Sequence, residues 1–176
     1  MKHLFLSIAM LCALSTFSQE TTEKNIKKNE IKINLLYFIL DFPEITYERL
    51  LTDQTALGVS VAFPIESGAS MLGNDLNFIM NPYYRVYFGE KPNTGFFVDG
   101  NAALFSQRKT EDDFFTGEKE RGMDFGFGFN VATKYKTKNG WVAETYFGLT
   151  KTVINSEYVK RTNILLRIGI IIGKTF

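Results

Sequence analysis

The last segment of the chain, residues 163–176, constrains the fold more than any other stretch. Read two residues at a time, it separates into two faces, and this period of two is typical of a β-strand. One face is apolar except for Lys174 and carries Ile164, Leu166, Ile168, Ile170, Ile172 and Phe176. The other face mixes Arg167 with small and apolar residues. A membrane β-barrel has this arrangement, because its apolar face points outward into lipid and its polar or small face points into a narrow lumen.

The beginning of the chain has the composition of a secretory signal peptide. Lys2 and His3 precede an apolar run at 4–14, and Thr16 and Ser18 occupy the positions expected before a cleavage site. The run is too short to span a bilayer as a helix. We therefore expect residues 1–18 to be a signal peptide, 19–29 a polar N-terminal tail and 30–176 the folded domain.

Removal of this signal peptide changes which reactive and charged side chains the mature chain contains. The single histidine, His3, and the single cysteine, Cys12, both leave with it, so the mature chain can form no disulfide. Loss of Lys2 lowers the Lys and Arg count from 20 to 19, which equals the 19 Asp and Glu. This balance provides no electrostatic basis for binding nucleic acid.

Eight segments of alternating apolar and polar residues follow the tail, with turn residues between them. They are 30–40, 44–50, 55–64, 78–88, 96–107, 121–135, 141–151 and 163–176. Asn139 followed by Gly140 is a strong signal for a tight hairpin between the sixth and seventh segments. The expected fold is all-β, an eight-stranded antiparallel up-and-down transmembrane β-barrel.

Segment length, loop lengths and aromatic placement favour a membrane barrel. About ten residues at ~3.3 Å each, tilted by roughly 40°, cover the ~25 Å apolar band of a membrane barrel. With a periplasmic N-terminus, the connections at 51–54, 89–95 and 136–140 are short and periplasmic, and those at 65–77, 108–120 and 152–162 are long and external. Only the connection at 41–43 is shorter than this scheme expects. Aromatic residues suited to the headgroup level lie near the segment ends: Tyr37, Tyr47, Phe88, Phe96, Tyr135, Trp141 and Phe176.

The chain resembles the small eight-stranded outer-membrane barrels of the OmpX and OmpA-barrel type, and still more a group of short, uncharacterised Gram-negative outer-membrane β-barrel proteins. The resemblance rests on the signal peptide, the eight segments, K-I-N-L-L-Y at 32–37, E-I-T-Y-E at 44–48 and the last segment. It implies that a terminal aromatic with apolar residues at alternate positions is a signal for the barrel-assembly machinery. Here this signal falls on Phe176, Ile172, Ile170 and Ile168, and Lys174 departs from the pattern.

With the apolar faces outward, charged residues of both signs point into the lumen. The expected lumen charge network consists of Lys32, Glu48, Arg85, Asp99, Asp124, Lys134, Glu144 and Arg167. Because an unpaired buried charge is costly, these groups should pair, with Asp124 or Glu144 as the partner of Arg167. Small inward residues such as Gly58 would make room for Tyr83 and Arg85. The interior of an eight-stranded barrel is little wider than its side chains, which favours a salt-bridge plug over a ligand or ion path.

The amino-acid composition of the mature chain argues against catalysis. Outer-membrane barrel hydrolases, acyltransferases and proteases resemble one another in using a histidine base, and residues 19–176 contain neither histidine nor cysteine. We therefore expect no enzyme, no cofactor and no histidine or cysteine metal site. Asp112 and Asp113 are better explained as solvated acids than as a weak cation site.

The sequence favours a non-enzymatic outer-membrane β-barrel with a plugged polar lumen and a structural or loop-mediated role. Its expected partners are outer-membrane lipid, the barrel-assembly machinery and an extracellular partner contacted through loops. Phe114 and Phe115 are candidates for an exposed loop anchor, although a ring that folds over the barrel rim or touches the outer leaflet explains them better. The expected state is a monomer. One alternative is a soluble periplasmic or secreted barrel that binds a small apolar ligand as lipocalins do, with the apolar faces pointing inward. The second is a histidine-free outer-membrane enzyme that modifies lipid.

Overall fold

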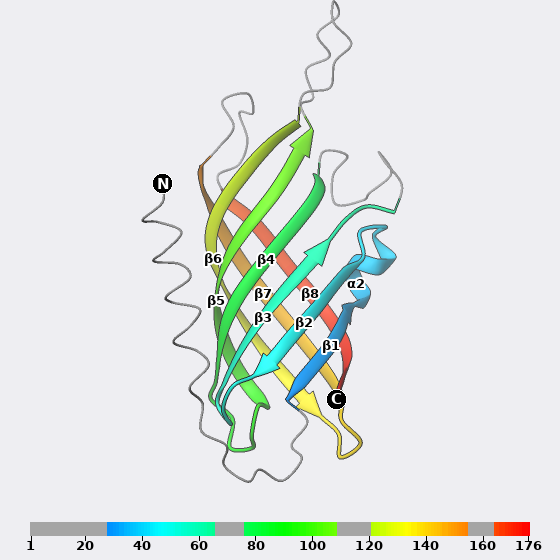
Figure 1. Ribbon diagram of the computed structural model, residues 1–176, viewed down its shortest axis with the longest axis vertical. Coiled ribbons are helices and arrows are strands. Elements are labelled where there is room, and N and C mark those ends of the chain that lie inside the picture. The colour runs from blue at the N-terminus through cyan, green and yellow to red at the C-terminus, as the bar shows by residue number, and fades with distance from the viewer. Residues whose placement is uncertain (1–27, 66–75, 109–120, 155–163) are drawn as a thin grey trace, which may run out of the picture.

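The computed structural model describes residues 28–65, 76–108, 121–154 and 164–176, which form a single closed barrel (Figure 1). Its elements are β1 (Asn29–Asn34), α2 (Leu35–Ile39), β2 (Glu44–Leu50), β3 (Thr55–Ala62), β4 (Leu76–Tyr87), β5 (Gly95–Arg108), β6 (Arg121–Lys136), β7 (Trp141–Ile154) and β8 (Ile164–Thr175). Each strand pairs antiparallel with the next, and β8 closes the ring by pairing antiparallel with β1. The predicted eight-stranded up-and-down topology is confirmed.

Short turns at 51–54, 88–94 and 137–140 mark one end of the barrel, which we call the turn end. The opposite end, where β3, β5 and β7 finish, is the loop end. The described strand ends that flank the predicted long connections lie there, whereas residues 66–75, 109–120 and 155–163 fall outside the described residues. Phe114, Phe115, Asp112 and Asp113 belong to these parts, so their predicted roles stay predictions.

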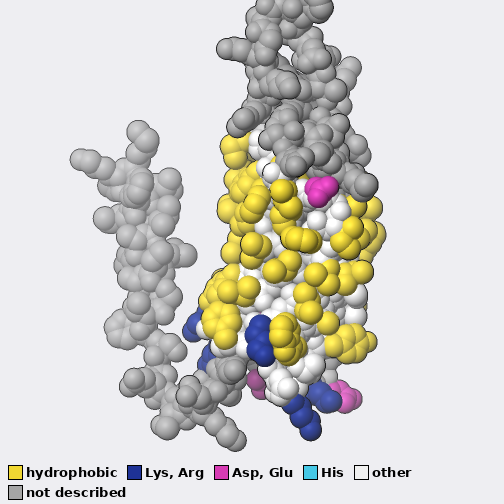
Figure 2. Space-filling view, turned by 90° about the vertical axis from the view of Figure 1, so that its right-hand side faces the viewer, with side chains coloured by type: hydrophobic (Ala, Val, Ile, Leu, Met, Phe, Trp, Pro, Cys, Tyr) yellow, Lys and Arg dark blue, Asp and Glu magenta, His cyan; other side chains and the backbone are white. Residues whose placement is uncertain are grey.

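Alternation along the strands places apolar side chains outside and polar side chains inside. In β2 the exposed residues Ile45, Tyr47 and Arg49 alternate with buried residues of the other parity. Figure 2 shows the result as a broad belt of apolar side chains on the outer surface, with Lys and Arg gathered at the turn end. This orientation does not fit the soluble lipocalin-like alternative, which requires the apolar faces to point inward.

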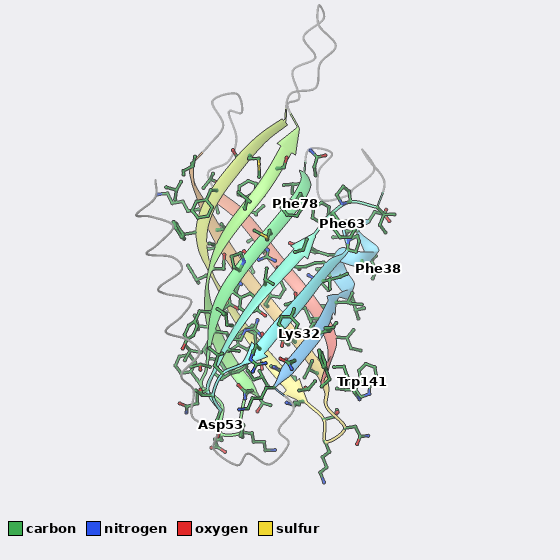
Figure 3. All side chains as sticks on the ribbon, in the orientation of Figure 1. Lys32, Phe38, Asp53, Phe63, Phe78 and Trp141 are labelled. Atoms are coloured by element: carbon green, nitrogen blue, oxygen red, sulfur yellow. The ribbon has the colours of Figure 1, made fainter. Side chains whose placement is uncertain are left out.

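Six of the seven aromatic residues that the sequence predicts near the ends of the outer face are exposed. They are Tyr47, Phe88, Phe96, Tyr135, Trp141 and Phe176. Figure 3 shows Trp141 projecting outward at the turn end, whereas Lys32 lies inside the barrel. The prediction for Tyr37 is wrong, because this side chain is only 3% exposed and points inward.

The strands divide the barrel wall into two parts of unequal height. The strands β1, β2 and β3, which we call the short wall, have 6, 7 and 8 residues. The strands β4 to β8, the tall wall, have 12 to 16 residues. At ~3.3 Å per residue and a tilt of roughly 40°, β1 rises about 15 Å, which is less than the ~25 Å apolar band of a membrane barrel. The short wall therefore closes only the turn-end half of the barrel.

The helix α2 lies where β1 and β2 would have continued, so the predicted strand at 30–40 is wrong beyond Asn34. The Asn34 side chain accepts a hydrogen bond from the Tyr37 backbone N–H at 3.4 Å and caps the helix. The helix ends at Ile39 with Leu40 as its C-cap, Asp41 then adopts a left-handed φ of 57°, and Pro43 comes two residues later. In the described part of the chain no helix is long and apolar enough to cross a membrane.

Candidate functional site in the barrel lumen

Charged side chains from six of the strands meet inside the turn-end half of the barrel. We call this group the lumen network, and it consists of Glu30, Lys32, Glu48, Arg85, Asp99, Lys134, Lys136 and Glu144. Each member has the strand parity that faces inward, and all are buried except Lys136, which is partly exposed. The lumen is therefore filled at this level by side chains that pair with one another.

Two ammonium groups share the same three carboxylates at the centre of the network. Lys32 Nζ lies 2.6 Å from Glu144, 2.8 Å from Glu48 and 3.2 Å from Glu30. Lys134 Nζ lies 2.6 Å from Glu30, 3.3 Å from Glu48 and 3.7 Å from Glu144. These contacts join β1, β2, β6 and β7 across the lumen, so the network braces strands that are not neighbours in the sheet.

Arg85 extends the network toward β5. Its Nη1 atom lies 2.8 Å from Glu48 and 3.0 Å from Glu144, and its Nη2 atom lies 3.2 Å from Asp99. The guanidinium stacks 3.7 Å from the centre of the Phe97 ring, an arrangement that suits a delocalised cation. Asn130 donates a hydrogen bond to Asp99 at 2.5 Å and completes this side of the network.

The lumen network is electrically balanced. Its four acids, Glu30, Glu48, Asp99 and Glu144, face four bases, Lys32, Arg85, Lys134 and Lys136. Glu48 also accepts hydrogen bonds from the hydroxyls of Tyr83 at 2.6 Å and Tyr87 at 2.9 Å. Burial of charge is tolerated when it is paired and hydrogen-bonded, and both conditions hold here.

Three of these carboxylates have a geometry that would also suit a metal ion. Oxygen atoms of Glu30, Glu48 and Glu144 lie within 4.8 Å of one another. The ammonium groups of Lys32 and Lys134 already contact all three carboxylates, so the position of a cation is taken by the chain's own side chains.

A second cluster, which we call the Arg167 cluster, lies closer to the loop end. Arg167 pairs with Glu44, and its Nη2 atom donates to Ser60 Oγ at 3.4 Å. Glu44 also accepts hydrogen bonds from Asn34 at 2.8 Å and from the Tyr146 hydroxyl at 3.0 Å. The prediction that Asp124 or Glu144 would pair with Arg167 is therefore wrong.

Asp124 belongs to neither of the two clusters. It is buried on β6, where it pairs in register with Phe105, whereas Asn130 beside the lumen network pairs with Asp99. Asp124 thus lies six residues further along β6 toward the loop end. Of the eight residues predicted for a single network, the structure brings together Lys32, Glu48, Arg85, Asp99, Lys134 and Glu144.

Glu30 and Glu44 are lumen residues that the prediction omitted. Glu30 shares its strand parity with Lys32, and Glu44 shares its parity with Glu48. The alternation therefore contained the signal, but both residues lie at the ends of their segments, where strand limits are least certain.

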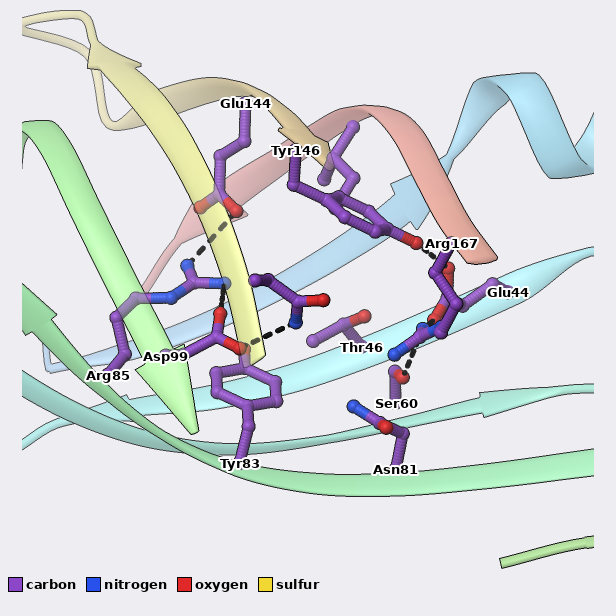
Figure 4. A pocket seen from close by; sticks show the side chains of 12 residues that line it. Glu44, Thr46, Ser60, Asn81, Tyr83, Arg85, Asp99, Glu144, Tyr146 and Arg167 are labelled. Atoms are coloured by element: carbon purple, nitrogen blue, oxygen red, sulfur yellow. Dashed lines mark hydrogen bonds and ion pairs between the residues drawn. The ribbon is translucent and has the colours of Figure 1, made fainter. Parts of the chain in front are cut away.

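A cavity of about 20 Å³ separates the lumen network from the Arg167 cluster, and residues of both line it (Figure 4). Four buried lining atoms have no hydrogen-bond partner: Nε of Arg85, Nε of Arg167, Oδ1 of Asn81 and Oδ1 of Asn130. The volume suits a water molecule and is far too small for a drug-sized ligand. The close-up shows Arg85 and Arg167 on opposite sides of this space.

Apolar clusters lie toward both ends of the lumen. The loop-end cluster consists of Tyr37, Phe42, Ala62, Ile79, Ala103 and Phe105. The turn-end cluster consists of Leu50, Ala56, Tyr87, Phe97 and Ala132. Close packing of the large rings requires small neighbours, and a side chain at Gly58 would collide with the Tyr83 ring, as the sequence predicts.

Comparison with known proteins places the fold but not an activity. No protein-family model matches the sequence, and no characterised protein sequence matches it. The structure is similar to the N-terminal β-barrel domain of OprF from Pseudomonas aeruginosa, with a TM-score of 0.55 and 15% sequence identity. The similarity covers 85% of this chain and 98% of that domain. The chain thus has the closed eight-stranded fold of an OmpA-type outer-membrane barrel, as its sequence predicts.

Proposed function

We propose that the protein is a non-enzymatic, structural β-barrel of the outer membrane, with a lumen closed to solutes and a loop end available for interactions. The lumen network is the observation that carries this proposal. Its central ammonium groups each contact three carboxylates, and both apolar clusters pack toward the ends of the same lumen. Opening a path for ions would require several of these buried pairs to separate together, which is costly.

The outward apolar belt supports the membrane location. Isoleucine, leucine and phenylalanine side chains cover the outer face along the tall wall, which suits a hydrocarbon environment. The segment at 1–18, with its charged start and short apolar run, supports export to the envelope. Outer-membrane lipid and the barrel-assembly machinery are the partners that such a location requires.

Fractionation tests the location. The protein should stay with outer membranes after carbonate extraction, and its electrophoretic mobility should change when the sample is heated, since a closed barrel resists detergent unfolding. Release by carbonate together with unchanged mobility would exclude a membrane barrel.

Electrical recording in planar bilayers tests the closed lumen. Protein inserted into a bilayer should give no stable current steps above the leak of the bare bilayer. A general porin recorded under the same conditions is the positive control. Stable unitary current steps from the wild-type protein would show that the lumen is open and that the barrel is a channel.

A further inference from the structure

A patch with two cations lies on the outer face at the turn end, across β7, β8, β1 and β2. Strand register aligns its residues in one row, since Trp141 pairs with Lys174, Lys174 with Ile31 and Ile31 with Tyr47. Asn29 pairs with Arg49 one step nearer the turn end on the same face of the sheet. We call these six residues the basic patch: Asn29, Ile31, Tyr47, Arg49, Trp141 and Lys174.

Hydrogen bonds hold the two cations at the borders of this patch. Arg49 Nη1 and the Tyr47 hydroxyl both donate to Asn29 Oδ1, at 3.0 Å and 2.9 Å. On the other side, Lys174 Nζ donates to the Asn139 carbonyl at 2.8 Å and lies 4.8 Å from the centre of the Trp141 ring. Ile31 lies between them and is 48% exposed. With strands ~4.8 Å apart, β8 and β2 flank this isoleucine at about 10 Å from each other.

The next row toward the middle of the barrel is purely aliphatic. Ile33 pairs with Ile172 on one side and with Ile45 on the other, and all three are exposed. An amphiphile that places its headgroup on the basic patch would therefore lay its acyl chain along these isoleucines. Trp141 and Tyr47 have the amphipathic rings that favour the boundary between headgroups and acyl chains.

We propose that the basic patch binds the headgroup of an anionic phospholipid, with the phosphate between Lys174 and Arg49 and an acyl chain along Ile33. The proposal rests on the membrane location proposed above. The short turns of such barrels face the periplasm, where the neighbouring leaflet consists of phospholipid. The six patch residues include two bases and no acid, so the charge complements a phosphate.

Trp141 provides a direct probe, because it is the only tryptophan in the chain. The protein is reconstituted in phosphatidylcholine vesicles that contain, at equal fractions, either phosphatidylglycerol or phosphatidylcholine brominated on the acyl chains. Brominated phosphatidylglycerol should quench Trp141 fluorescence more strongly. The ratio of the two quenching constants measures the preference for the anionic lipid.

Variants show which side chains produce the preference for the anionic lipid. Arg49→Gln and Lys174→Gln should each reduce the ratio by up to about fivefold, since a basic residue near an anionic surface contributes about that factor. Lys91→Gln in the turn between β4 and β5 removes the same charge away from the patch and should leave the ratio unchanged. The heat-dependent shift in mobility confirms that each variant is folded.

Three results would overturn the proposal. Equal quenching by the two brominated lipids means that there is no anionic site, and an equal loss in Lys91→Gln means that only net charge matters. Loss of the preference on addition of inorganic phosphate at constant ionic strength would assign the site to free phosphate. Absence of quenching by both lipids is a separate outcome, because it means that the protein is not in the bilayer and the proposed function itself fails.

Discussion

The turn-end and loop-end halves of this barrel share five strands but are completed in different ways. In the turn-end half β1, β2 and β3 complete a hydrogen-bonded ring, and the lumen network fills it. In the loop-end half β8 residues 164–170 pair with β7, whereas pairing with β1 starts only at Ile171. There α2 packs against β8, and the loop-end cluster fills the interior.

This difference shows how backbone closure and side-chain chemistry depend on each other. A complete ring satisfies its own backbone groups and holds the strands in fixed positions, so charged side chains can be arranged with several partners each. Where the ring is incomplete, the short helix α2 stands in place of further strand pairing. The Asn34 side chain and the Leu40 N–H pair with backbone groups at its two ends, and apolar packing attaches it without exact register. The two halves should therefore respond differently to substitution.

Removal of Glu48 should produce the largest loss of stability. This fully buried carboxylate contacts Lys32 at 2.8 Å, Arg85 at 2.8 Å and Lys134 at 3.3 Å. Glu48→Ala leaves these cations short of a partner, so we expect the free energy of unfolding in lipid vesicles to fall by about 3–5 kcal/mol. Denaturant titration measures this value.

Glu90→Ala is the matched control, because Glu90 is an exposed acid in a turn at the same end. It should change the unfolding free energy by no more than about 0.5 kcal/mol. A loss below about 1 kcal/mol for Glu48→Ala would show that the network contributes little to the turn-end half.

Truncation of Phe42 tests the apolar filling of the loop-end half. Phe42 is fully buried in the loop-end cluster, and its ring meets Tyr37 edge to face at 6.3 Å. Phe42→Ala should lower the free energy of unfolding by about 3 kcal/mol, the lower end of the usual range, because a five-residue helix can shift into part of the space.

Phe38→Ala on the outward side of the same helix removes an equal volume from an exposed position. It should reduce the unfolding free energy by about 1 kcal/mol, because truncation of an exposed side chain leaves no buried cavity. Equal losses for the two variants would show that the loop-end cluster is not a packed core.

The two halves also differ in how well the sequence predicts them. Alternation predicted which charged residues face inward, because side-chain parity in a strand does not depend on the rest of the barrel. It did not predict that Arg167 pairs with Glu44, since that contact between β8 and β2 depends on the stagger of strands around the closed ring.

The helix α2 was mispredicted because the alternating segment 30–40 reads as one strand. Residues 35–39 are apolar without interruption, so they fit either element, and a short apolar run cannot be assigned from periodicity alone. The decisive features are the Asn34 cap and the left-handed Asp41 before Pro43. These signals sit at the ends of the segment and outweigh its alternation.

Asn34 lies at the junction of the two halves, so its substitution should have an intermediate effect. Its side chain caps α2 through the Tyr37 N–H and donates to Glu44 at 2.8 Å. Asn34→Ala should reduce the free energy of unfolding by about 1–2 kcal/mol, the usual value for loss of a helix cap together with a buried hydrogen bond. Gln54→Ala in an exposed turn is the control, and an equal loss of stability there would show that Asn34 has no special role at the junction.

The smallest expected effect is the energetic coupling between the halves. Tyr83 donates to Glu48 in the lumen network at 2.6 Å, and Ile79 belongs to the loop-end cluster on the same strand. Four residues of β-strand separate them by about 13 Å, beyond the distance at which substitutions usually interact. In a double-mutant cycle, Tyr83→Phe and Ile79→Val should therefore be additive within about 0.5 kcal/mol.

A second cycle supplies the contrast, because Tyr83→Phe combined with Glu48→Gln perturbs two groups that share a hydrogen bond. These substitutions should couple by about 0.5–3 kcal/mol in denaturant titrations. If Tyr83 and Ile79 coupled as strongly as Tyr83 and Glu48, a substitution in one half would alter the packing of the other half through β4. The turn-end and loop-end halves would then unfold as one packed unit rather than as two differently stabilised halves.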